Sequence, residues 1–268
     1  MYVDDNDTVY VANCGSNRID QWMSGKTTAS VVVGVNDAGD QKLNGPMDVI
    51  FDKSSDSLII SDSNNKRVVR WSRQNCTWET IILGIGCRGL AMDNDGYLYV
   101  SDIDNHEVRR WRIGDTKGTL VAGGKGKGKR LDQLDQPTYI YVDEDYSVYV
   151  AEKANHRVTK WVQNAQQGIV VAGGQGQGNS LSQLNSPYGV IVDRLGTVYV
   201  SDLGNHRVVR WVKDAREGGV VVGANGNGEQ PNQLNQPVGL SFDGALNLYV
   251  VDHSNHRVQK FLLNSITS

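Results

Sequence analysis

The sequence predicts an all-β fold, a six-bladed β-propeller of four-stranded antiparallel blades in which the last blade lacks its outer strand. Two observations support this. A motif that ends in an aromatic residue recurs six times along the 268 residues. Each copy consists of short runs rich in Val, Ile, Tyr and Trp, the residues enriched in strands, and no helical period is sustained. Chains of this length and type commonly form one domain, so residues 1–268 are expected to be a single domain.

The repeat is clearest between Val100–Trp111 and Val150–Trp161. Its aromatic residue recurs at spacings of 49, 40, 50, 50 and 50 residues, at Trp22, Trp71, Trp111, Trp161, Trp211 and Phe261. A four-stranded unit of this size cannot bury both of its faces alone, and stacking such units radially produces a propeller. The six copies therefore predict six blades, with these aromatic side chains in equivalent positions between blades.

Each copy divides into four expected strands. In the fourth copy they are Thr138–Asp143, Ser147–Glu152, Arg157–Val162 and Gly168–Ala172. The first copy starts late in its first strand, at Tyr2–Asp4, and the last ends just after Phe261. The remaining Asn264–Ser268 are too few for a normal fourth strand. We expect an open edge at the last blade, and we expect the chain to belong to a longer protein.

The turn between the second and third strands carries the sequence Asn-His-Arg-Val at 155–158, 205–208 and 255–258. Blade 3 departs from it at Glu107 and blade 2 at Lys66, and blade 1 keeps only Arg18. This signature resembles the NHL-repeat family, which is named for the tripeptide, over essentially the whole chain. The resemblance implies a β-propeller and a platform for protein or RNA, as in tripartite-motif proteins. It also implies that the missing outer strand often comes from before the first repeat.

Opposite charges flank the same turn and are expected to clip it across the hairpin. The pairs are Asp62/Arg67, Glu152/Arg157, Asp202/Arg207 and Asp252/Arg257. Blade 3 has Asp102 and Glu107 instead, where Arg109 or Arg110 is expected to compensate.

The repeated histidines, His106, His156, His206 and His256, are expected to be structural, because turns spread around a disc do not converge on one ion. His253 stands beside His256 in the sequence without a third ligand. No tightly bound transition metal and no cofactor are therefore expected, and a calcium ion held loosely by carbonyls at the mouth is left open.

Composition excludes few functions. The net charge of −3 provides no field that would drive the whole molecule onto nucleic acid or lipid. Cys14, Cys76 and Cys87 form no disulfide framework and are expected to be free and buried. The apolar runs are strand-sized and no targeting signal begins the sequence, so membrane insertion is not expected and the compartment stays unassigned.

Candidate ligand-binding residues lie where the chain reaches the centre of the ring. The residue after the proline of each first strand is Met47, Thr138, Tyr188 or Val238, and Arg88 aligns with them after Cys87. The scaffold repeats while these side chains do not, which is typical of a site grafted on a repeat, although neutral variation at a rim is an alternative. The candidates at this end are Asp48, Arg88, Tyr139 and Tyr188.

A glycine-rich loop adds four basic candidates, Lys125, Lys127, Lys129 and Arg130. The loop nearly matches a phosphate-binding loop but lacks the Ser or Thr and the following helix. Equivalent loops lack lysine, so the glycines are expected to serve the turn. Either a solvated basic loop or an anion contact is consistent with the charges.

These features favour a binding or scaffold module that recognises a protein or peptide on the loop-rich face. An RNA- or other anion-binding propeller is the first alternative. A metal-dependent lyase or lactonase of the six-bladed class is the second, although the zinc-binding His that follows the first-strand Pro in amidating lyases is absent here. No catalytic residues are recognised. Self-association through the exposed edge of the last blade is a further hypothesis.

Overall fold

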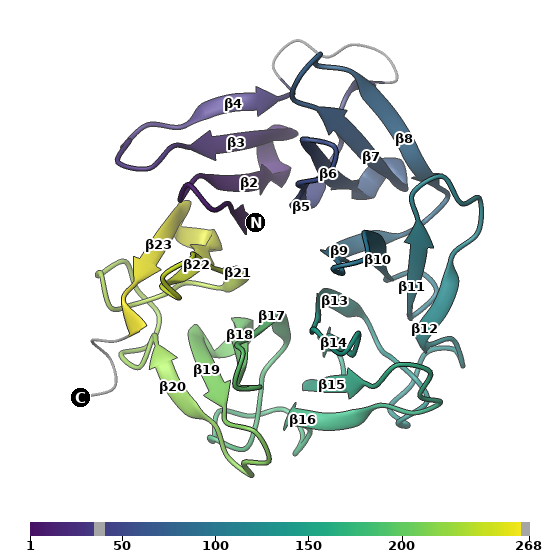
Figure 1. The fold of residues 1–268 in the computed structure, drawn as a ribbon. Coiled ribbons are helices and arrows are strands. Elements are labelled where there is room, and N and C mark those ends of the chain that lie inside the picture. Colours follow the sequence, from purple (N-terminus) through teal and green to yellow (C-terminus); the bar gives the residue numbers. More distant parts are fainter. Residues whose placement is uncertain (35–40, 264–268) are drawn as a thin grey trace.

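The structure, a computed structural model, describes residues 1–34 and 41–263. Six antiparallel sheets are arranged as blades around a common centre (Figure 1). Within each blade the strands follow chain order, so the first strand lies at the centre and the last at the rim. The predicted six-bladed propeller is confirmed, and residues Asn264–Ser268 lie outside the described part of the chain.

The first three blades have four strands each. Blade 1 contains β1 (Tyr2–Val3), β2 (Val9–Asn13), β3 (Arg18–Trp22) and β4 (Ser30–Val33). Blade 2 contains β5 (Pro46–Asp52), β6 (Ser57–Asp62), β7 (Arg67–Ser72) and β8 (Trp78–Leu83). Blade 3 contains β9 (Cys87–Met92), β10 (Tyr97–Asp102), β11 (Glu107–Arg112) and β12 (Thr119–Gly123).

The last three blades repeat this order, and the sixth has three strands among the described residues. Blade 4 contains β13 (Pro137–Val142), β14 (Val148–Glu152), β15 (Arg157–Trp161) and β16 (Ile169–Gly173). Blade 5 contains β17 (Pro187–Val192), β18 (Val198–Asp202), β19 (Arg207–Trp211) and β20 (Gly219–Val222). Blade 6 contains β21 (Pro237–Phe242), β22 (Leu248–Asp252) and β23 (Arg257–Phe261). The expected strands of blade 4 were off by one residue at most of their ends.

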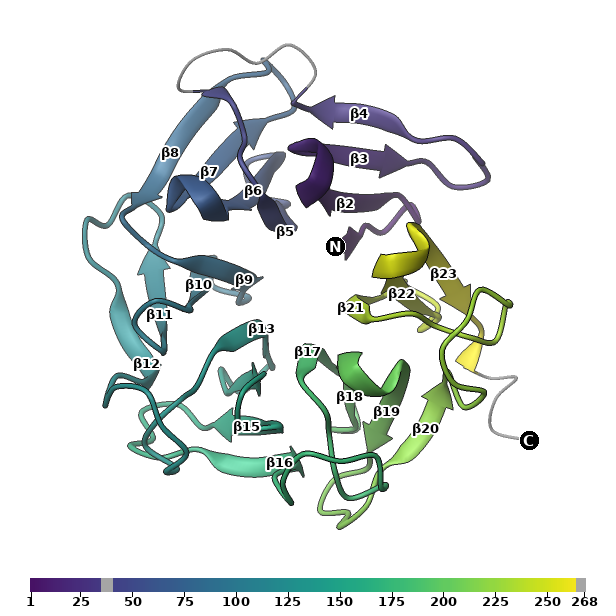
Figure 2. The same ribbon diagram turned by 180° about the vertical axis from the view of Figure 1, so that it is seen from behind.

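One face of the disc carries the connections from each outer strand to the next blade and the turns between second and third strands (Figure 2). We call it the loop-rich face. Four of its turns contain a short 3-10 helix: η1 (Cys14–Ser16), η3 (Ser63–Asn65), η4 (Leu203–Asn205) and η5 (His253–Asn255). None of the described helices is long and apolar enough to cross a membrane.

The apolar cores lie between blades, not within them. Trp161 of blade 4 is 2% exposed and packs in a cluster with Tyr99 and Val108 of blade 3. The six aromatic residues of the repeat occupy one register, each paired with the first or second residue of its second strand, as in Trp161 with Val148 and Phe261 with Leu248. The predicted equivalence of these residues is therefore confirmed.

Replacing Trp161 by Ala is expected to lower the unfolding free energy by roughly 3–5 kcal/mol, the cost of emptying a large aromatic site in a core. Denaturant unfolding measures the loss. Val162→Ala is the matched control, because Val162 is 46% exposed and should change stability by no more than about 0.5 kcal/mol. A loss below about 1 kcal/mol for the Trp161 variant would show that the aromatic row is superficial.

Buried ion pairs clip the turns of the loop-rich face. The Glu152 carboxylate is fully buried and accepts Nε of Arg157 at 2.8 Å. Asn155 donates to the same carboxylate, and the Arg157 guanidinium also donates to the carbonyls of Lys129 and Arg130. The network recurs around Arg207 and Arg257. Each clip therefore ties the turn of a blade to the loop that leads into it.

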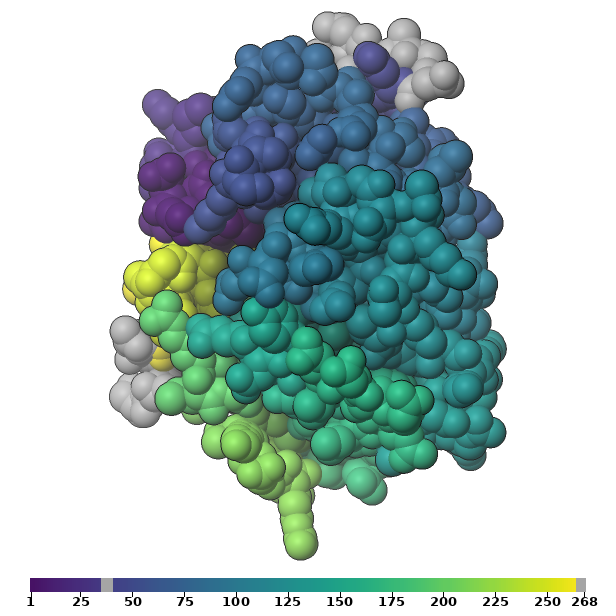
Figure 3. All heavy atoms as spheres, turned by 45° about the vertical axis from the view of Figure 1, so that its right-hand side comes forward, coloured from purple at the N-terminus to yellow at the C-terminus, as the bar shows by residue number. Residues whose placement is uncertain are grey.

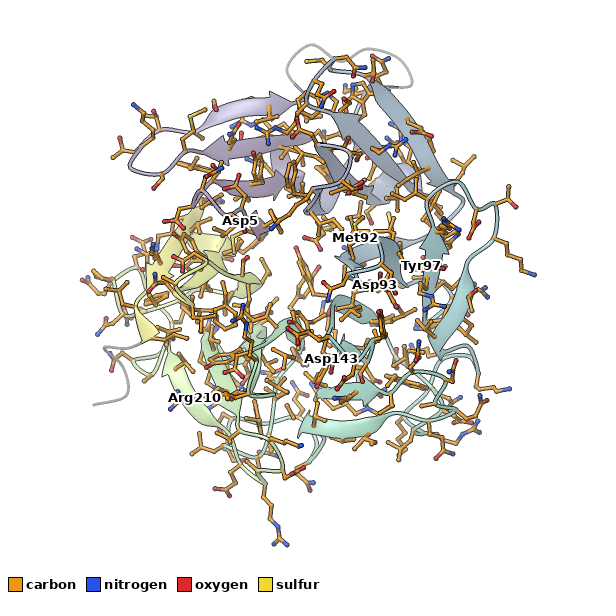
Figure 4. All side chains as sticks on the ribbon, in the orientation of Figure 1. Asp5, Met92, Asp93, Tyr97, Asp143 and Arg210 are labelled. Carbon is orange, nitrogen blue, oxygen red and sulfur yellow. The ribbon has the colours of Figure 1, made fainter. Side chains whose placement is uncertain are left out.

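In blade 3, Glu107 stands at the arginine position, and an arginine of the same strand balances its charge. Arg109 pairs with Glu107 from the next position along the same face of β11, as one of the two expected compensations. Arg110 instead lies over the Tyr97 ring at 4.7 Å, on the face opposite the loops. On that face the Tyr99 hydroxyl donates to Asp93 at 2.9 Å, and Figure 4 shows Asp93 and Tyr97 in the same blade.

The repeated histidines connect neighbouring blades. Nδ1 of His156 accepts the backbone N–H of Ser186 at 3.0 Å, across the junction from blade 4 to blade 5. His106 and His206 accept the corresponding amides of Gln136 and Gln236, each at 3.1 Å. In blade 1 an Asn side chain, that of Asn17, accepts the Gly45 amide at 2.7 Å instead. Three of the four repeated histidines thus have a specific structural hydrogen-bond partner on the next blade.

Protonating His156 removes its acceptor, and burial lowers the pKa of its imidazole. A lowered pKa favours the neutral ring in the folded state. Stability is then complete above the ordinary pKa of about 6.5 and falls as pH drops through it toward the lowered value. His156→Asn, which copies the solution of blade 1, is expected to lose less stability than the parent protein between about pH 8 and pH 5.5. Unfolding free energies at both pH values test this, and an identical loss in both proteins would contradict it.

Cysteine burial was predicted correctly for one residue of three. Cys87 is buried at the start of β9, and burial raises the pKa of its thiol to about 12. Cys14 and Cys76 are exposed, because they lie in turns, where the chain runs over the surface.

The interface between the last and first blades is the thinnest of the six. Figure 3 shows the purple first blade and the yellow last blade in contact at one side of the disc. Four buried apolar residues form this interface, Met1, Val3, Val9 and Tyr249. Each of the other five interfaces contains eight to eleven among the described residues. The outer edge of β23 also has no strand beside it in the part of the chain that the structure describes.

Hydrogen exchange is expected to be faster at this seam than elsewhere, since a thinner core opens at lower free energy. The amides of Val9–Val11, and those of Arg257–Leu262 that bond to β22, should exchange faster than their counterparts in blades 4 and 5. Native-state exchange followed by mass spectrometry or NMR measures this. Equal protection in all four blades would mean that another contact closes the ring.

Candidate binding site at the mouth of the propeller

Five first strands enter the centre of the ring from the loop-rich face, and the residues that follow their first position define what we call the mouth. The mouth residues are Met47, Arg88, Thr138, Tyr188 and Val238. The next position along each strand holds Asp48, Gly89, Tyr139, Gly189 and Gly239. No two mouth residues are the same, while the strands behind them keep one register.

Hydroxyl side chains tie the mouth of one blade to the mouth of the next. Ser61 of β6 accepts the Asp48 amide at 2.8 Å and donates to the Arg88 carbonyl of the following blade at 2.9 Å. The same bridge recurs from Ser101 to the Thr138 carbonyl at 2.6 Å and from Ser201 to the Val238 carbonyl at 2.7 Å. These bonds hold the backbone of the mouth rigid.

The position of this serine holds Ala12, Ala151 or Val251 in the other three blades, and in two of these cases another hydroxyl makes the bond. Ala151 replaces it in blade 4, and there the Thr138 hydroxyl donates to the Tyr188 carbonyl at 2.7 Å. Blade 1 has Ala12, which leaves the Met47 carbonyl without a hydroxyl from the preceding blade. That carbonyl instead accepts the Tyr139 hydroxyl at 2.7 Å, from a residue 92 positions away.

Tyr139 therefore crosses the centre of the ring. A Cβ at Gly239 would lie 3.7 Å from the Tyr139 hydroxyl, and one at Gly89 would lie 2.6 Å from the Tyr139 Cα, so that a side chain there would collide with the neighbouring strand. Its ring packs against Tyr188, with centroids 5.8 Å apart. Burial raises the pKa of the Tyr139 hydroxyl well above its usual range, and the Asp48 charge adds to the effect. Tyr139 is neutral and already bonded, so it closes the centre of the ring.

Asp48 is also satisfied internally. Its carboxylate is buried and accepts the Met1 amino group at 2.7 Å and the amides of Val49 and Leu90 at 2.9 and 3.0 Å. Burial raises the pKa of Asp48, and the Met1 ammonium and the amide donors oppose that rise. The sequence placed Asp48 near the mouth but could not show that its oxygens are occupied.

Arg88 is different, because its guanidinium has donors to spare. Its Nε is buried and has no hydrogen-bond partner in the described part of the chain. None of the described carboxylates lies within ion-pair distance of it. Its polar neighbour is the Tyr188 hydroxyl, whose pKa burial raises and the Arg88 charge lowers.

The basic loop lies apart from this cluster. The carbonyls of Lys129 and Arg130 are held by Arg157, so the loop sits over the clip of blade 4, toward the rim. The Arg130 guanidinium pairs with Asp132 at 2.8 Å, and Nζ of Lys127 lies 3.8 Å from Asp135. The structure thus brings Asp48, Arg88, Tyr139 and Tyr188 together and leaves Lys125–Arg130 on the same face but outside their contacts.

The glycines of that loop serve the turn, as expected. An isolated bridge from Lys127 to Leu134 recurs from Gln177 to Leu184 and from Asn227 to Leu234 in the equivalent loops. Loops with and without lysine therefore share one conformation, and only the charge is individual to this one.

The connection into blade 3 is much shorter than the others. Three residues, 84–86, join β8 to β9, whereas 12 to 14 residues join the outer strand to the next blade at the other four junctions. The chain passes almost directly from rim to centre here (Figure 2). The spacing of 40 residues between Trp71 and Trp111 already signalled this, but its consequence for the mouth needed the structure. Arg88 follows the short connection, where no loop is built up over it.

Other hollows repeat with the blades. A groove of about 1150 Å³ lies between blades 4 and 5, with the exposed side chains of Leu195, Val212 and Leu246 on its walls. A similar groove of about 810 Å³ lies between blades 2 and 3. In the described residues no cluster of three or more His, Cys, Asp or Glu side chains is arranged to hold a metal ion.

Comparison with known proteins finds one matching repeat model and several structures of the same fold. The NHL-repeat model matches residues 234–261, which include the Asn-His-Arg turn of blade 6. No curated protein sequence matches the chain. An auxiliary nutrient binding protein from Bacteroides thetaiotaomicron has a similar structure, with a TM-score of 0.76 at 16% identity over 97% of this chain and 67% of that one.

Two further solved structures share the fold. A nidogen/laminin complex matches with a TM-score of 0.71 at 18% identity, covering 94% of this chain and 88% of the other. A gluconolactonase from Xanthomonas campestris matches with a TM-score of 0.61 at 16% identity, covering 81% and 75%. At these identities the likeness concerns the fold. The matched turn of blade 6 and its hydrogen bonds recur in blades 4 and 5, and the other blades keep its register. The chain is therefore a six-bladed β-propeller whose last blade matches the NHL-repeat model.

Proposed function

We propose that this propeller is a binding module that recognises a protein or peptide ligand at the mouth on its loop-rich face. The observation that carries the proposal is the contrast between scaffold and mouth. Clips, histidine bridges and hydroxyl bridges recur from blade to blade, while the five mouth residues all differ. A repeated frame that presents unlike side chains at one place is how a site is grafted on a fold.

The chemistry of the mouth suits a protein ligand. Met, Tyr and Arg are enriched in protein interfaces relative to the rest of a surface, and Met47, Tyr188 and Arg88 stand together here. Tyr188 also contributes a rigid ring backed by Tyr139, which limits the entropy lost on binding. Among proteins of similar fold, a nutrient-binding protein and a nidogen/laminin complex are consistent with ligand or protein binding.

An anion- or RNA-binding role is the second candidate, and the Lys125–Arg130 loop favours it. Its lysines are exposed on the same face as the mouth. RNA recognition, however, stacks unpaired bases on exposed aromatic side chains beside a basic track. Here the mouth tyrosines lie in the centre of the ring, while the lysines lie toward its rim. The fold also occurs in enzymes, such as the gluconolactonase, so a catalytic role is compatible with the architecture alone.

Selection of random peptides displayed on phage tests the proposal. Peptides that bind the parent protein are expected to lose affinity at least about 30-fold on Tyr188→Ala, the effect of truncating an aromatic hot spot by ~2 kcal/mol or more. Isothermal calorimetry or fluorescence anisotropy measures this.

Leu195→Ser is the matched control, because Leu195 is an exposed apolar residue in a turn on the opposite face. Peptides that bind Tyr188→Ala as tightly as the parent would contradict the proposed site. Binding of an oligouridine RNA that disappears when Lys125, Lys127 and Lys129 are changed to Glu would favour the second candidate instead.

A further inference from the structure

We propose that the mouth binds its ligand through a carboxylate group, which enters from the loop-rich face beside the short connection at 84–86 and is received by the Arg88 guanidinium. This inference rests on the proposed binding function and names the chemistry of its ligand. The juxtaposition that carries it is an unpaired, partly buried guanidinium beside the Tyr188 ring.

Arg88 has hydrogen-bonding capacity that the described residues leave unused. A guanidinium has five N–H donors in a planar fork, and burying a charge without a partner is costly. Arginines elsewhere on this face are fully used: Arg157 and Arg207 each bind the carboxylate of their own blade and carbonyls of the incoming loop. Arg88 has no carboxylate within ion-pair distance, and its buried Nε has no partner, among the described residues. An arginine held in this way is complementary to an acceptor supplied from outside.

Two hydrogen bonds hold the backbone at Arg88. Its carbonyl accepts the Ser61 hydroxyl at 2.9 Å, and the amide of the following residue, Gly89, donates to Ser101 at 2.8 Å. The peptide group between Arg88 and Gly89 is therefore held, at its carbonyl and at its N–H, by side chains of adjacent strands. A rigid backbone of this kind lowers the entropy lost when a ligand binds.

The carboxylate that already lies near Arg88 is not available as its partner. Asp48 also lies at the centre of the ring, but its oxygens are occupied by the Met1 amino group and by two backbone amides. It cannot turn to Arg88 without leaving those donors unpaired in a buried site. Beside the Tyr188 hydroxyl, a further acceptor for Arg88 can be supplied by a ligand.

The charge at the mouth favours a carboxylate ligand over a phosphate. Arg88 is the one cationic side chain among the five mouth residues, and the Asp48 carboxylate in the same cluster is already paired with the Met1 ammonium. A single guanidinium binds the two oxygens of a carboxylate in a fork and matches its single negative charge. A phosphate or a nucleic-acid backbone brings more charge and requires several cations around it.

The surroundings of Arg88 also indicate which kind of molecule would carry the carboxylate. The exposed Lys125–Arg130 loop on the same face attracts acidic chains over about a Debye length. The Tyr188 ring provides an apolar surface for the methylene groups of an Asp or Glu side chain. We therefore identify the ligand as an acidic peptide segment, with one carboxylate seated on Arg88.

The direct test follows the Nε–Hε NMR signals of the arginine side chains during titration with acetate at constant ionic strength. Arg88→Lys assigns the Arg88 signal, and acetamide is the uncharged control. The Arg88 signal is expected to shift and saturate with acetate but not with acetamide, while the exposed Arg216 shows no saturation. An Arg88 signal that behaves like Arg216 overturns the inference. A larger shift with inorganic phosphate than with acetate also overturns it, in favour of a phosphate ligand.

A second measurement uses the peptides selected on the parent protein. Arg88→Gln is expected to weaken their binding roughly 10- to 100-fold, the effect of losing a charge-assisted hydrogen bond. Changing one Asp or Glu of the peptide to its amide should cause a similar loss with the parent and little further loss with Arg88→Gln. Peptides that depend on Tyr188 but not on Arg88 overturn the carboxylate inference and leave the binding function standing.

Stability separates a binding role from a packing role. Replacing an unpaired buried charge by a neutral side chain is often neutral or stabilising, so Arg88→Gln should unfold at the same or a higher denaturant concentration than the parent. A clear loss of stability would identify Arg88 as a packing residue and overturn its assignment to the ligand.

Discussion

In four of the six blades, a buried pair between the last carboxylate of the second strand and the first arginine of the third strand controls the loop-rich end of the molecule. In blade 4, Glu152 is fully buried and Arg157 joins it to the carbonyls of the incoming loop. A lone buried carboxylate would be costly, and a lone buried arginine likewise, so neither partner is useful without the other. Because the same arginine also holds the loop, the pair determines where the next first strand begins. The mouth is therefore positioned by residues that lie outside it.

The ring is assembled by a chain of small connections, and they are unevenly distributed. Histidine or asparagine side chains accept an amide across four of the six junctions, and hydroxyl groups bridge four. The junction between the last and first blades has neither kind among the described residues and has the smallest core. The open edge of β23 lies in the last blade. Exposed edges of this kind favour pairing with another strand, which makes blade 6 the natural place for contact with another segment or chain.

Stability and binding make opposite demands at the centre of the ring. Tyr139 supplies a bond that blade 1 cannot make, and Asp48 binds only internal donors. These two residues stabilise the centre. Arg88 does not contribute in this way, since its charge is partly buried without a partner. Unpaired polar groups of this kind concentrate at functional sites, where the scaffold offsets their cost. The sequence-based candidates therefore divide into Asp48 and Tyr139, whose polar groups are bonded within the ring, Arg88 and Tyr188, on which the proposed site rests, and a basic loop toward the rim.

Local patterns alone determined the blade number, the position of nearly every strand and the equivalence of the aromatic row. These features repeat every 40 to 50 residues and depend on short-range alternation and turn chemistry, so one chain contains six copies of the same evidence. The clips were also predictable, because both partners lie on neighbouring strands of one hairpin. The partners that His156, Tyr139 and Asp48 find on other blades were not. They lie up to 92 residues away and are brought together only by the closure of the ring. Burial at the centre is likewise a property of six blades meeting, which is why only the tertiary structure separated the satisfied Asp48 from the unsatisfied Arg88.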